Sequence, residues 1–239
     1  MSNNYTNVVG ERKKFNEDGS FRSFPGNTIV CNLADQPKVL DEIVWIQQEH
    51  STKLPFAHKF TWNPLESFHM TVFELLCHYN RLTPYWSSLL DLKTPLEEVD
   101  RFFAKALEPL EFPERFTMKV ERVSKTTIIV IPYDQATHQR LHEFRDQASR
   151  ATGVRFPNHD TYGYHISFGY QQIQLTPEEE LQFKQFQHDF SRLLVERLNV
   201  IEMEKTDYTV FEDMTKFVPY TEHARAMLQR EKQLGAIKK

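Results

Sequence analysis

The feature that most constrains the fold is an order of predicted elements that occurs twice along the 239-residue chain. In residues 28–73 a β-rich run and an amphipathic helix are followed by a strand that contains His-x-Thr. The same order recurs in residues 126–168, where the last strand contains His-x-Ser. Alternating apolar residues mark the strands, and apolar residues at every third or fourth position mark the helices. A duplicated order of this kind predicts two similar halves that face each other.

The element boundaries follow from turn and cap signals. The predicted strands cover residues 28–33, 68–73, 116–123, 126–132, 164–168 and 200–211. The predicted helices cover residues 35–50, 94–109, 134–153 and 176–198, and a polar helix closes the chain. Helices and strands therefore alternate irregularly, with a tight hairpin at Ser124-Lys125, which indicates an α+β fold.

Polar residues mark the predicted ends of three helices. Thr94-Pro-Leu-Glu97 and Thr176-Pro-Glu-Glu179 both have the capping-box pattern with proline at the first helical position. Asp134 is the expected N-cap of the helix that follows the hairpin, and Gly153 is its expected C-terminal stop.

The first 27 residues differ in character from the rest of the chain. They are rich in Asn, Gly and charged residues and end at the turn signal Pro25-Gly26. We therefore expect an irregular N-terminal arm over residues 1–27 and a single bilobal domain over residues 28–239.

Charge and hydropathy exclude several classes of protein. With 29 basic and 33 acidic residues the net charge is −4, which argues against binding along a long nucleic acid. The longest aliphatic run, Ile128–Ile131, is far shorter than the roughly 20 apolar residues of a membrane span. The polar N-terminus lacks the apolar segment of a signal peptide, so we expect a cytoplasmic protein whose Cys31 and Cys77 stay reduced.

Common nucleotide and metal motifs are missing from the sequence. The 7 glycines cannot be arranged as GxGxxG or as GxxxxGK, which excludes Rossmann and P-loop sites. HExxH, GxSxG and CxxC are absent as well.

Two short motifs carry the chemistry of the predicted site, His69-Met-Thr71 and His165-Ile-Ser167. Because side chains alternate between the faces of a strand, each motif presents an imidazole and a hydroxyl on the same face. Where two such strands meet across a cleft, one imidazole can accept a proton from a nucleophile while the other donates a proton to a leaving group. The two hydroxyls can hold phosphoryl oxygens in line.

At these residues the chain resembles the 2H phosphoesterase superfamily, whose members have two His-x-Thr/Ser-x motifs with hydrophobic x in two pseudosymmetric lobes. Both motifs match at all four positions and lie 96 residues apart. The segments PGNTIVCNL and SFHMTVFE look most like the DUF1868 branch, and the resemblance covers roughly residues 28–211. It implies two lobes of mainly antiparallel sheet, with outer helices around a central cleft. It also implies hydrolysis or formation of cyclic or 2′,5′-linked phosphodiesters.

Three residues in the connection over residues 75–94 are further candidates for substrate binding. The guanidinium of Arg81 suits a phosphate, and the rings of Tyr79 and Trp86 suit stacking on a base or ribose. The alternatives are a solvated charge for Arg81 and loop packing for the two aromatic residues.

Other residues have competing interpretations. Strand alternation places Tyr164 and Tyr170 on the face opposite His165, so we expect them to pack in the core. His138 and His142 lie four residues apart on a predicted helix, a spacing that suits zinc ligands. An exposed polar helix face explains this second pair as well.

The sequence therefore predicts a metal-independent phosphodiesterase without a cofactor, in which His69 and His165 are the general acid and base. Thr71 and Ser167 would bind the phosphate of a small phosphodiester, a nucleotide or an RNA end. We expect a monomer that contacts neither a membrane nor a long nucleic acid. The alternatives are a non-catalytic module of the same fold that binds a nucleotide or RNA end, and a zinc hydrolase.

Overall fold

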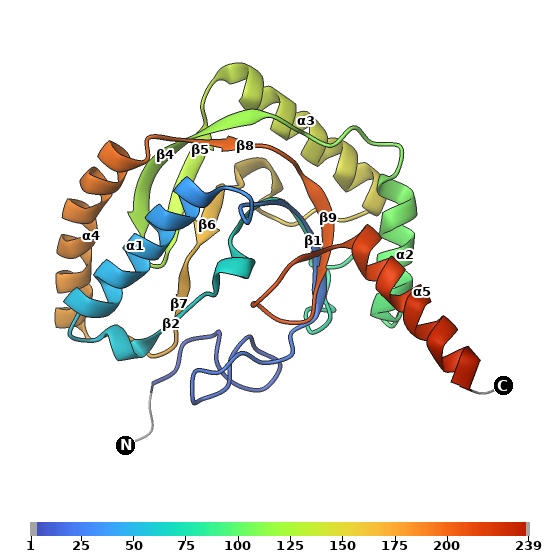
Figure 1. Cartoon of the computed structure of the whole chain (residues 1–239), viewed down its shortest axis with the longest axis horizontal. Helices are drawn as coiled ribbons and strands as arrows, with labels where there is room; N and C mark the ends of the chain where they lie inside the picture. Colours follow the sequence, from blue (N-terminus) through green and yellow to red (C-terminus); the bar gives the residue numbers. More distant parts are fainter. Residues whose placement is uncertain (1–3, 238–239) are drawn as a thin grey trace.

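A curled antiparallel sheet forms the centre of the computed structural model, which describes residues 4–237 (Figure 1). Within this part of the chain the sheet has eight strands in the order β10-β9-β1-β3-β6-β5-β4-β8. Their bounds are β1 Gly26–Asn32, β3 His69–Cys77, β4 Phe116–Ser124, β5 Thr127–Pro132, β6 His165–Ser167, β8 Val200–Met203, β9 Asp207–Phe211 and β10 Val218–Pro219. A smaller sheet pairs β2 (Phe60–Trp62) with β7 (Gly169–Gln171).

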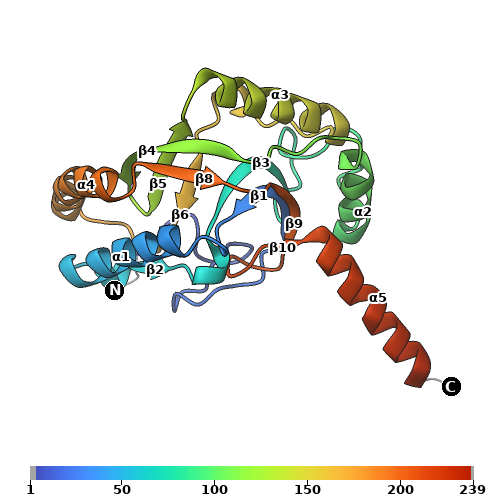
Figure 2. The same cartoon turned by 45° about the horizontal axis from the view of Figure 1, so that its top comes forward.

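Helices cover the sheet from two sides. The long helices are α1 Pro37–Lys53, α2 Leu96–Leu107, α3 Gln135–Thr152, α4 Pro177–Arg197 and α5 Tyr220–Ile237, and the short 3-10 helices are η1 Ala57–Lys59, η2 Leu65–Ser67 and η3 His159–Thr161. Figures 1 and 2 show α1 and α4 together on one side, α2 and α3 on another, and α5 extending away from the body. Among the described residues, no helix has the length and apolar character that crossing a membrane requires. The predicted α+β architecture is confirmed.

The two predicted halves share one sheet. In the first half β3 pairs with β1, which pairs with β9. In the second half β6 pairs with β5, which pairs with β4. The strands that carry the two His-x-Thr/Ser motifs, β3 and β6, are antiparallel neighbours and join the halves at the centre.

The segment predicted as a single strand over residues 200–211 forms two strands in different halves. β8 pairs with β4 at one edge of the sheet, whereas β9 pairs with β1 in the other half. Both strands contain β-favouring residues, and the local sequence does not show that they belong to different halves. The partner strands, which are distant in sequence, decide where each one pairs.

Cap geometry confirms two of the three predicted helix starts. The side chain of Asp134 accepts a hydrogen bond from the Thr137 N–H at 2.8 Å, and Gly153 ends the same helix with a φ of 70°. Thr176 and Glu179 form the predicted reciprocal capping box. The capping box predicted at Thr94 is wrong, because α2 begins only at Leu96, after Pro95, without a side-chain cap.

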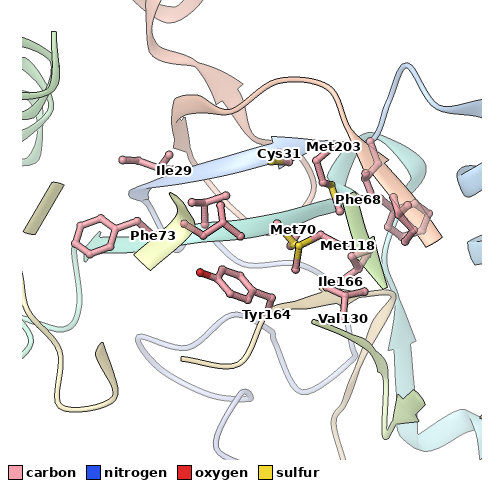
Figure 3. Close-up of a cluster of buried hydrophobic side chains, with 14 of the residues drawn as sticks. Ile29, Cys31, Phe68, Met70, Phe73, Met118, Val130, Tyr164, Ile166 and Met203 are labelled. Atoms are coloured by element: carbon pink, nitrogen blue, oxygen red, sulfur yellow. The ribbon is translucent and has the colours of Figure 1, made fainter. Parts of the chain in front are cut away.

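The core lies on the face of the sheet opposite the motif side chains. Met70 of β3 pairs with Ile166 of β6, and both side chains are fully buried. Figure 3 shows them in one cluster with Met118, Val130 and Tyr164. Replacing a buried Met by Ala in such a core costs about 2–5 kcal/mol. Rigid packing on this face therefore holds the two motif strands in register.

The segment predicted as an N-terminal arm packs against the domain through turns and isolated bridges. The Thr6 N–H donates to the Gln172 carbonyl at 2.8 Å, and the Phe24 N–H donates to the Glu212 carbonyl at 2.7 Å. Phe15 is fully buried and lies 5.2 Å from the ring of Tyr170. The segment thus crosses the open side of the sheet, near β7 and the loop after β9.

Candidate active site

The four motif side chains lie on one face of the paired central strands. Antiparallel pairing of Met70 with Ile166 places His69 opposite Ser167, and Thr71 opposite His165. Side chains of directly opposed residues share a face, with Cβ atoms about 4.5–5.5 Å apart. Each imidazole therefore has the hydroxyl of the other motif beside it.

Both imidazoles are oriented by the same backbone contact. The Nδ1 atom of His69 donates to the carbonyl oxygen of Ser67 at 2.6 Å. The Nδ1 atom of His165 donates to the carbonyl oxygen of Gly163 at 3.0 Å. In each case the acceptor lies two residues before the histidine, and no hydrogen bond within the described residues reaches either Nε2 atom. Such a contact fixes the ring and leaves Nε2 for proton transfer.

The two histidines differ in their surroundings. The ring of Phe217 lies 3.9 Å from that of His69, between centroids. Burial, with smaller contributions from the charges of His165 and Lys14, lowers the pKa of His69 to about 4. His69 is therefore neutral at pH 7 and can accept a proton, whereas His165 has a more exposed setting.

All four motif residues line one cavity of about 350 Å³. The other described residues around it are Lys14, Phe24, Asn27, Thr28, Glu74, Leu75, Leu76, Cys77, Asn80, Phe156, Tyr162, Tyr170, Phe211, Met214 and Phe217. A hollow of about 650 Å³ between α2, β9 and α5 is larger, but it contains neither motif. The chemistry of the smaller cavity makes it the candidate site.

A β-bulge brings a carboxylate into this cavity. Thr71 pairs with Val30 and Phe73 with Ile29, so Val72 is an extra residue with no partner on β1. Beyond it the alternation of side chains is reversed, and Glu74 lines the cavity in place of Phe73. Regular alternation along the strand predicts the opposite, which is why the sequence did not indicate Glu74.

A buried arginine supports the bulge from behind. The Arg145 guanidinium donates to the carbonyl oxygen of Val72 at 2.8 Å and to that of His159 at 3.0 Å. It also lies 4.2 Å from the centroid of the Tyr162 ring, which lines the cavity. From its position on α3, Arg145 thus connects the bulge at Val72 to the segment that carries Tyr162.

The prediction that Tyr170 packs on the face opposite His165 is wrong, whereas Tyr164 is buried as predicted. The chain leaves the main sheet at Phe168, and Tyr170 belongs to β7 of the small sheet. Alternation counted from His165 does not hold across this break. Tyr170 lines the cavity, and its hydroxyl donates to the Met214 sulfur at 3.8 Å.

Arg81 and Trp86 do not line the cavity. The Arg81 guanidinium donates to the carbonyl oxygens of His78, Leu92 and Thr94 at 3.0, 2.8 and 2.8 Å. It also lies 4.5 Å from the centroid of the Trp86 ring, whose side chain is buried. These contacts hold the loop after β3 together, in agreement with the packing alternative for Trp86.

Tyr79 does not line the cavity either. Its ring is 5.8 Å from that of Phe24, which lines the cavity, and 5.0 Å from that of His78. The structure therefore brings together the two histidines and two hydroxyls, but not the three loop candidates.

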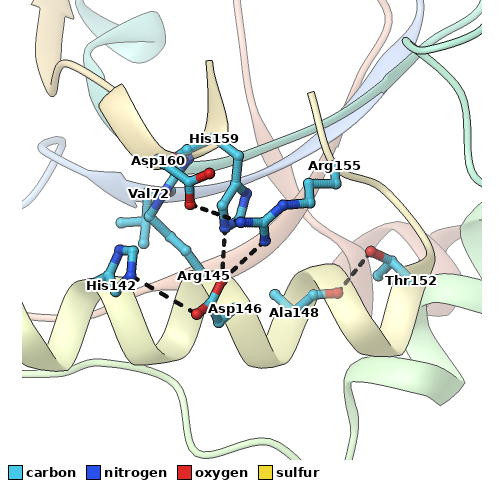
Figure 4. A network of polar contacts seen from close by, with 9 residues as sticks. All are labelled: Val72, His142, Arg145, Asp146, Ala148, Thr152, Arg155, His159 and Asp160. Atoms are coloured by element: carbon cyan, nitrogen blue, oxygen red, sulfur yellow. Dashed lines mark hydrogen bonds and ion pairs between the residues drawn. The ribbon is translucent and has the colours of Figure 1, made fainter. Parts of the chain in front are cut away.

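The alternative zinc site lies in a polar network on α3 (Figure 4). Ligand atoms of His142, Asp146 and Asp160 lie within 4.8 Å of one another, and His138 does not belong to this group. Arg155 donates to Asp146 at 3.0 Å and to Asp160 at 2.7 Å, so a guanidinium already balances both carboxylates. This network connects α3 to the segment before β6.

Comparisons with known proteins bear on the family and on the fold. The family described as 2H-phosphodiest, domain of unknown function (DUF1868), matches residues 14–129, slightly less than half of the chain. A crystal structure of ATU0111, a conserved protein of unknown function from Agrobacterium tumefaciens str. C58, is similar with a TM-score of 0.83 and 27% identity. That similarity covers 91% of this chain and 93% of the other. No relative was found among the curated proteins. The match over residues 14–129, which contains the first His-x-Thr motif, confirms that the chain resembles the DUF1868 branch of the 2H phosphoesterases.

Proposed function

We propose that this protein hydrolyses a cyclic or 2′,5′-type phosphodiester of a nucleotide or RNA end. The observation that carries the proposal is the pairing of β3 with β6, which sets two histidines and two hydroxyls around one cavity. Both histidines are oriented by a backbone carbonyl in the same way. General acid and base catalysis of phosphodiester cleavage needs two such proton-transfer groups near one phosphorus atom.

The different surroundings of the histidines support a division of roles. His69, with a pKa of about 4, is neutral at pH 7 and takes the proton of the attacking water. The water oxygen bonds to phosphorus, the bond from phosphorus to the leaving oxygen breaks, and His165 protonates that oxygen. The product is a phosphomonoester with a new hydroxyl group, and exchange with solvent returns both histidines to their starting states.

The hydroxyls act on the phosphoryl group. Thr71 and Ser167 line the same cavity as the imidazoles and are positioned to donate hydrogen bonds to the non-bridging oxygens. A cavity of about 350 Å³ is at the small end for ligand sites, which favours a mononucleotide or the end of a chain.

Turnover assays test the proposal. The purified protein is offered a 2′,3′-cyclic nucleotide, a 3′,5′-cyclic nucleotide and a 2′,5′-linked dinucleotide, each with and without EDTA. We expect hydrolysis of at least one substrate, unchanged by EDTA and lost in the variant His165→Ala. Activity that EDTA removes and zinc restores would contradict the mechanism. Tight binding of these nucleotides without turnover would instead support a non-catalytic binding module.

A further inference from the structure

The N-terminal arm places a cation in the cavity of the two histidines. Among the described residues that line this cavity, Lys14 is the one lysine or arginine. Its Nζ atom lies 4.6 Å from the centroid of the Tyr170 ring and donates to the Tyr170 hydroxyl at 3.3 Å. No carboxylate among the described residues makes an ion pair with this ammonium, although Glu74 lines the same cavity.

The arm is built to hold this position. Phe15, the next residue, is fully buried and contacts the rings of Phe21 and Tyr170, each at 5.2 Å. The carbonyl oxygen of Lys14 accepts a hydrogen bond from the Arg22 N–H at 2.9 Å. The backbone at Lys14 and Phe15 is therefore anchored, and the ammonium is placed before any ligand arrives.

An ammonium group in this state has unused binding capacity. It carries three donors, and the described residues supply one acceptor, the Tyr170 hydroxyl. The field of Lys14 reaches the imidazole of His69, whose protonated form it disfavours. A site with one unpaired cation beside a neutral base and two hydroxyls is complementary to a singly charged phosphodiester.

We propose that Lys14 binds a non-bridging phosphate oxygen of the substrate, so that the N-terminal arm is part of the active site. This inference rests on the proposed function for its substrate, but it requires only that the cavity binds a phosphate. The ammonium neutralises charge on the phosphoryl oxygens as the nucleophile attacks. It also adds to the effect of burial, the larger cause of the lowered pKa of His69, because a nearby positive charge disfavours the imidazolium.

Binding of inorganic phosphate tests the inference apart from turnover. The full-length protein and the variants Lys14→Met, Lys14→Arg and Lys13→Met are titrated with phosphate by calorimetry at two ionic strengths. Methionine keeps the apolar stem of lysine without its charge, and Lys13 is an exposed neighbour that serves as the matched control.

We expect Lys14→Met to weaken phosphate binding about 10- to 100-fold and to reduce its salt dependence. Lys14→Arg should retain most of the affinity, and Lys13→Met should match the wild type. Equal phosphate affinity in the wild type and Lys14→Met, or no phosphate binding by the wild type, would overturn the inference. Phosphate binding that depends on Lys14 without turnover of any phosphodiester would support it and contradict the proposed function.

Discussion

The two halves of the central sheet present the same motif in different surroundings. In the first half, His69 lies beneath the Phe217 ring and within the field of Lys14. In the second half, His165 has the Tyr162 ring at 6.4 Å and a more exposed setting. Phe217 and Lys14 both lie outside the duplicated elements. Segments added around a symmetric pair of strands can therefore give two equivalent histidines different chemical roles.

The largest expected effect comes from removing either imidazole. His69→Ala and His165→Ala should each lower kcat/KM by about 10² to 10⁴, because each removes one proton-transfer group. The double variant should lose little more than the single variants, since groups that act in one step are not additive. Steady-state kinetics on a cyclic nucleotide measure these losses, and fully multiplicative losses would assign the two histidines to separate processes.

A substrate with a good leaving group separates the two roles. A p-nitrophenyl phosphodiester needs little protonation of its leaving oxygen. His165→Ala should therefore hydrolyse this substrate at most of the wild-type rate. His69→Ala should remain slow on the same substrate, because this variant still lacks the base. The opposite pattern would reverse the assignment of base and acid.

Removing either hydroxyl group should cause the next largest loss of activity. Thr71→Val and Ser167→Ala are each expected to lower kcat by about 10² to 10³, with smaller changes in KM, because their hydrogen bonds strengthen as charge builds on the phosphoryl group. Thr127→Val is a matched control: Thr127 pairs with Ser167 across the strands but does not line the cavity. A control loss as large as that of Thr71→Val would indicate damage to the sheet.

A second contrast between the halves concerns buried histidines outside the site. In the first half His50 is fully buried among aromatic rings, and its Nε2 atom has no partner within the described residues. Burial lowers its pKa from 6.5 to about 4. In the second half, burial also lowers the pKa of His159, but its contact with Asp146 at 3.0 Å acts in the opposite direction. The first half therefore has a buried imidazole that cannot readily be charged.

This contrast predicts how stability depends on pH. Because the pKa of His50 is lower in the folded than in the unfolded chain, the unfolded chain takes up the proton first as the pH falls below 6.5. The free energy of unfolding should thus fall between pH 6.5 and pH 4, by up to about 1.4 kcal/mol per pH unit from this group. Urea unfolding of His50→Leu should show a shallower fall. A slope equal to that of the wild type would contradict the prediction.

The smallest effect should come from the ring that covers His69. Phe217→Leu leaves an apolar side chain but opens part of the imidazole to water, so the pKa of His69 should rise from about 4 by up to about one unit. The rate at pH 7 should change only a few-fold. Because the reaction needs a neutral base and a protonated acid, the rate should follow a bell-shaped pH profile. Its acidic limb, which reports the base, should move to higher pH while the basic limb stays in place. A profile that does not move would show that Phe217 has no influence on the base.

Local pattern was sufficient for much of the fold and for the centre of the site. Period-2 alternation placed His69 with Thr71, and His165 with Ser167, because both pairs lie within uninterrupted stretches of strand. The caps at Asp134 and Thr176 were also predictable, since their hydrogen bonds span only three residues. Such features depend on neighbours in sequence.

The same alternation failed wherever strand pairing changed. Val72 forms a bulge against β1, which brings Glu74 to the cavity, and the break at Phe168 does the same for Tyr170. The bulge at Val72 has no glycine or proline beside it, whereas Gly169 directly follows the break at Phe168. Each depends on which distant strand lies alongside.

By itself, the sequence determined the paired histidines and hydroxyls and the duplicated order of elements that carries them. Tertiary structure decided which histidine is covered, which carboxylate and tyrosine reach the cavity, and where Lys14 lies. The physical reason is the distance along the sequence over which each effect acts. Alternation of side chains and helix capping depend on residues only a few positions apart. The contact between Lys14 and Tyr170 instead joins residues 156 positions apart, and the packing of Phe15 and the hydrogen bond from Arg22 hold it in place.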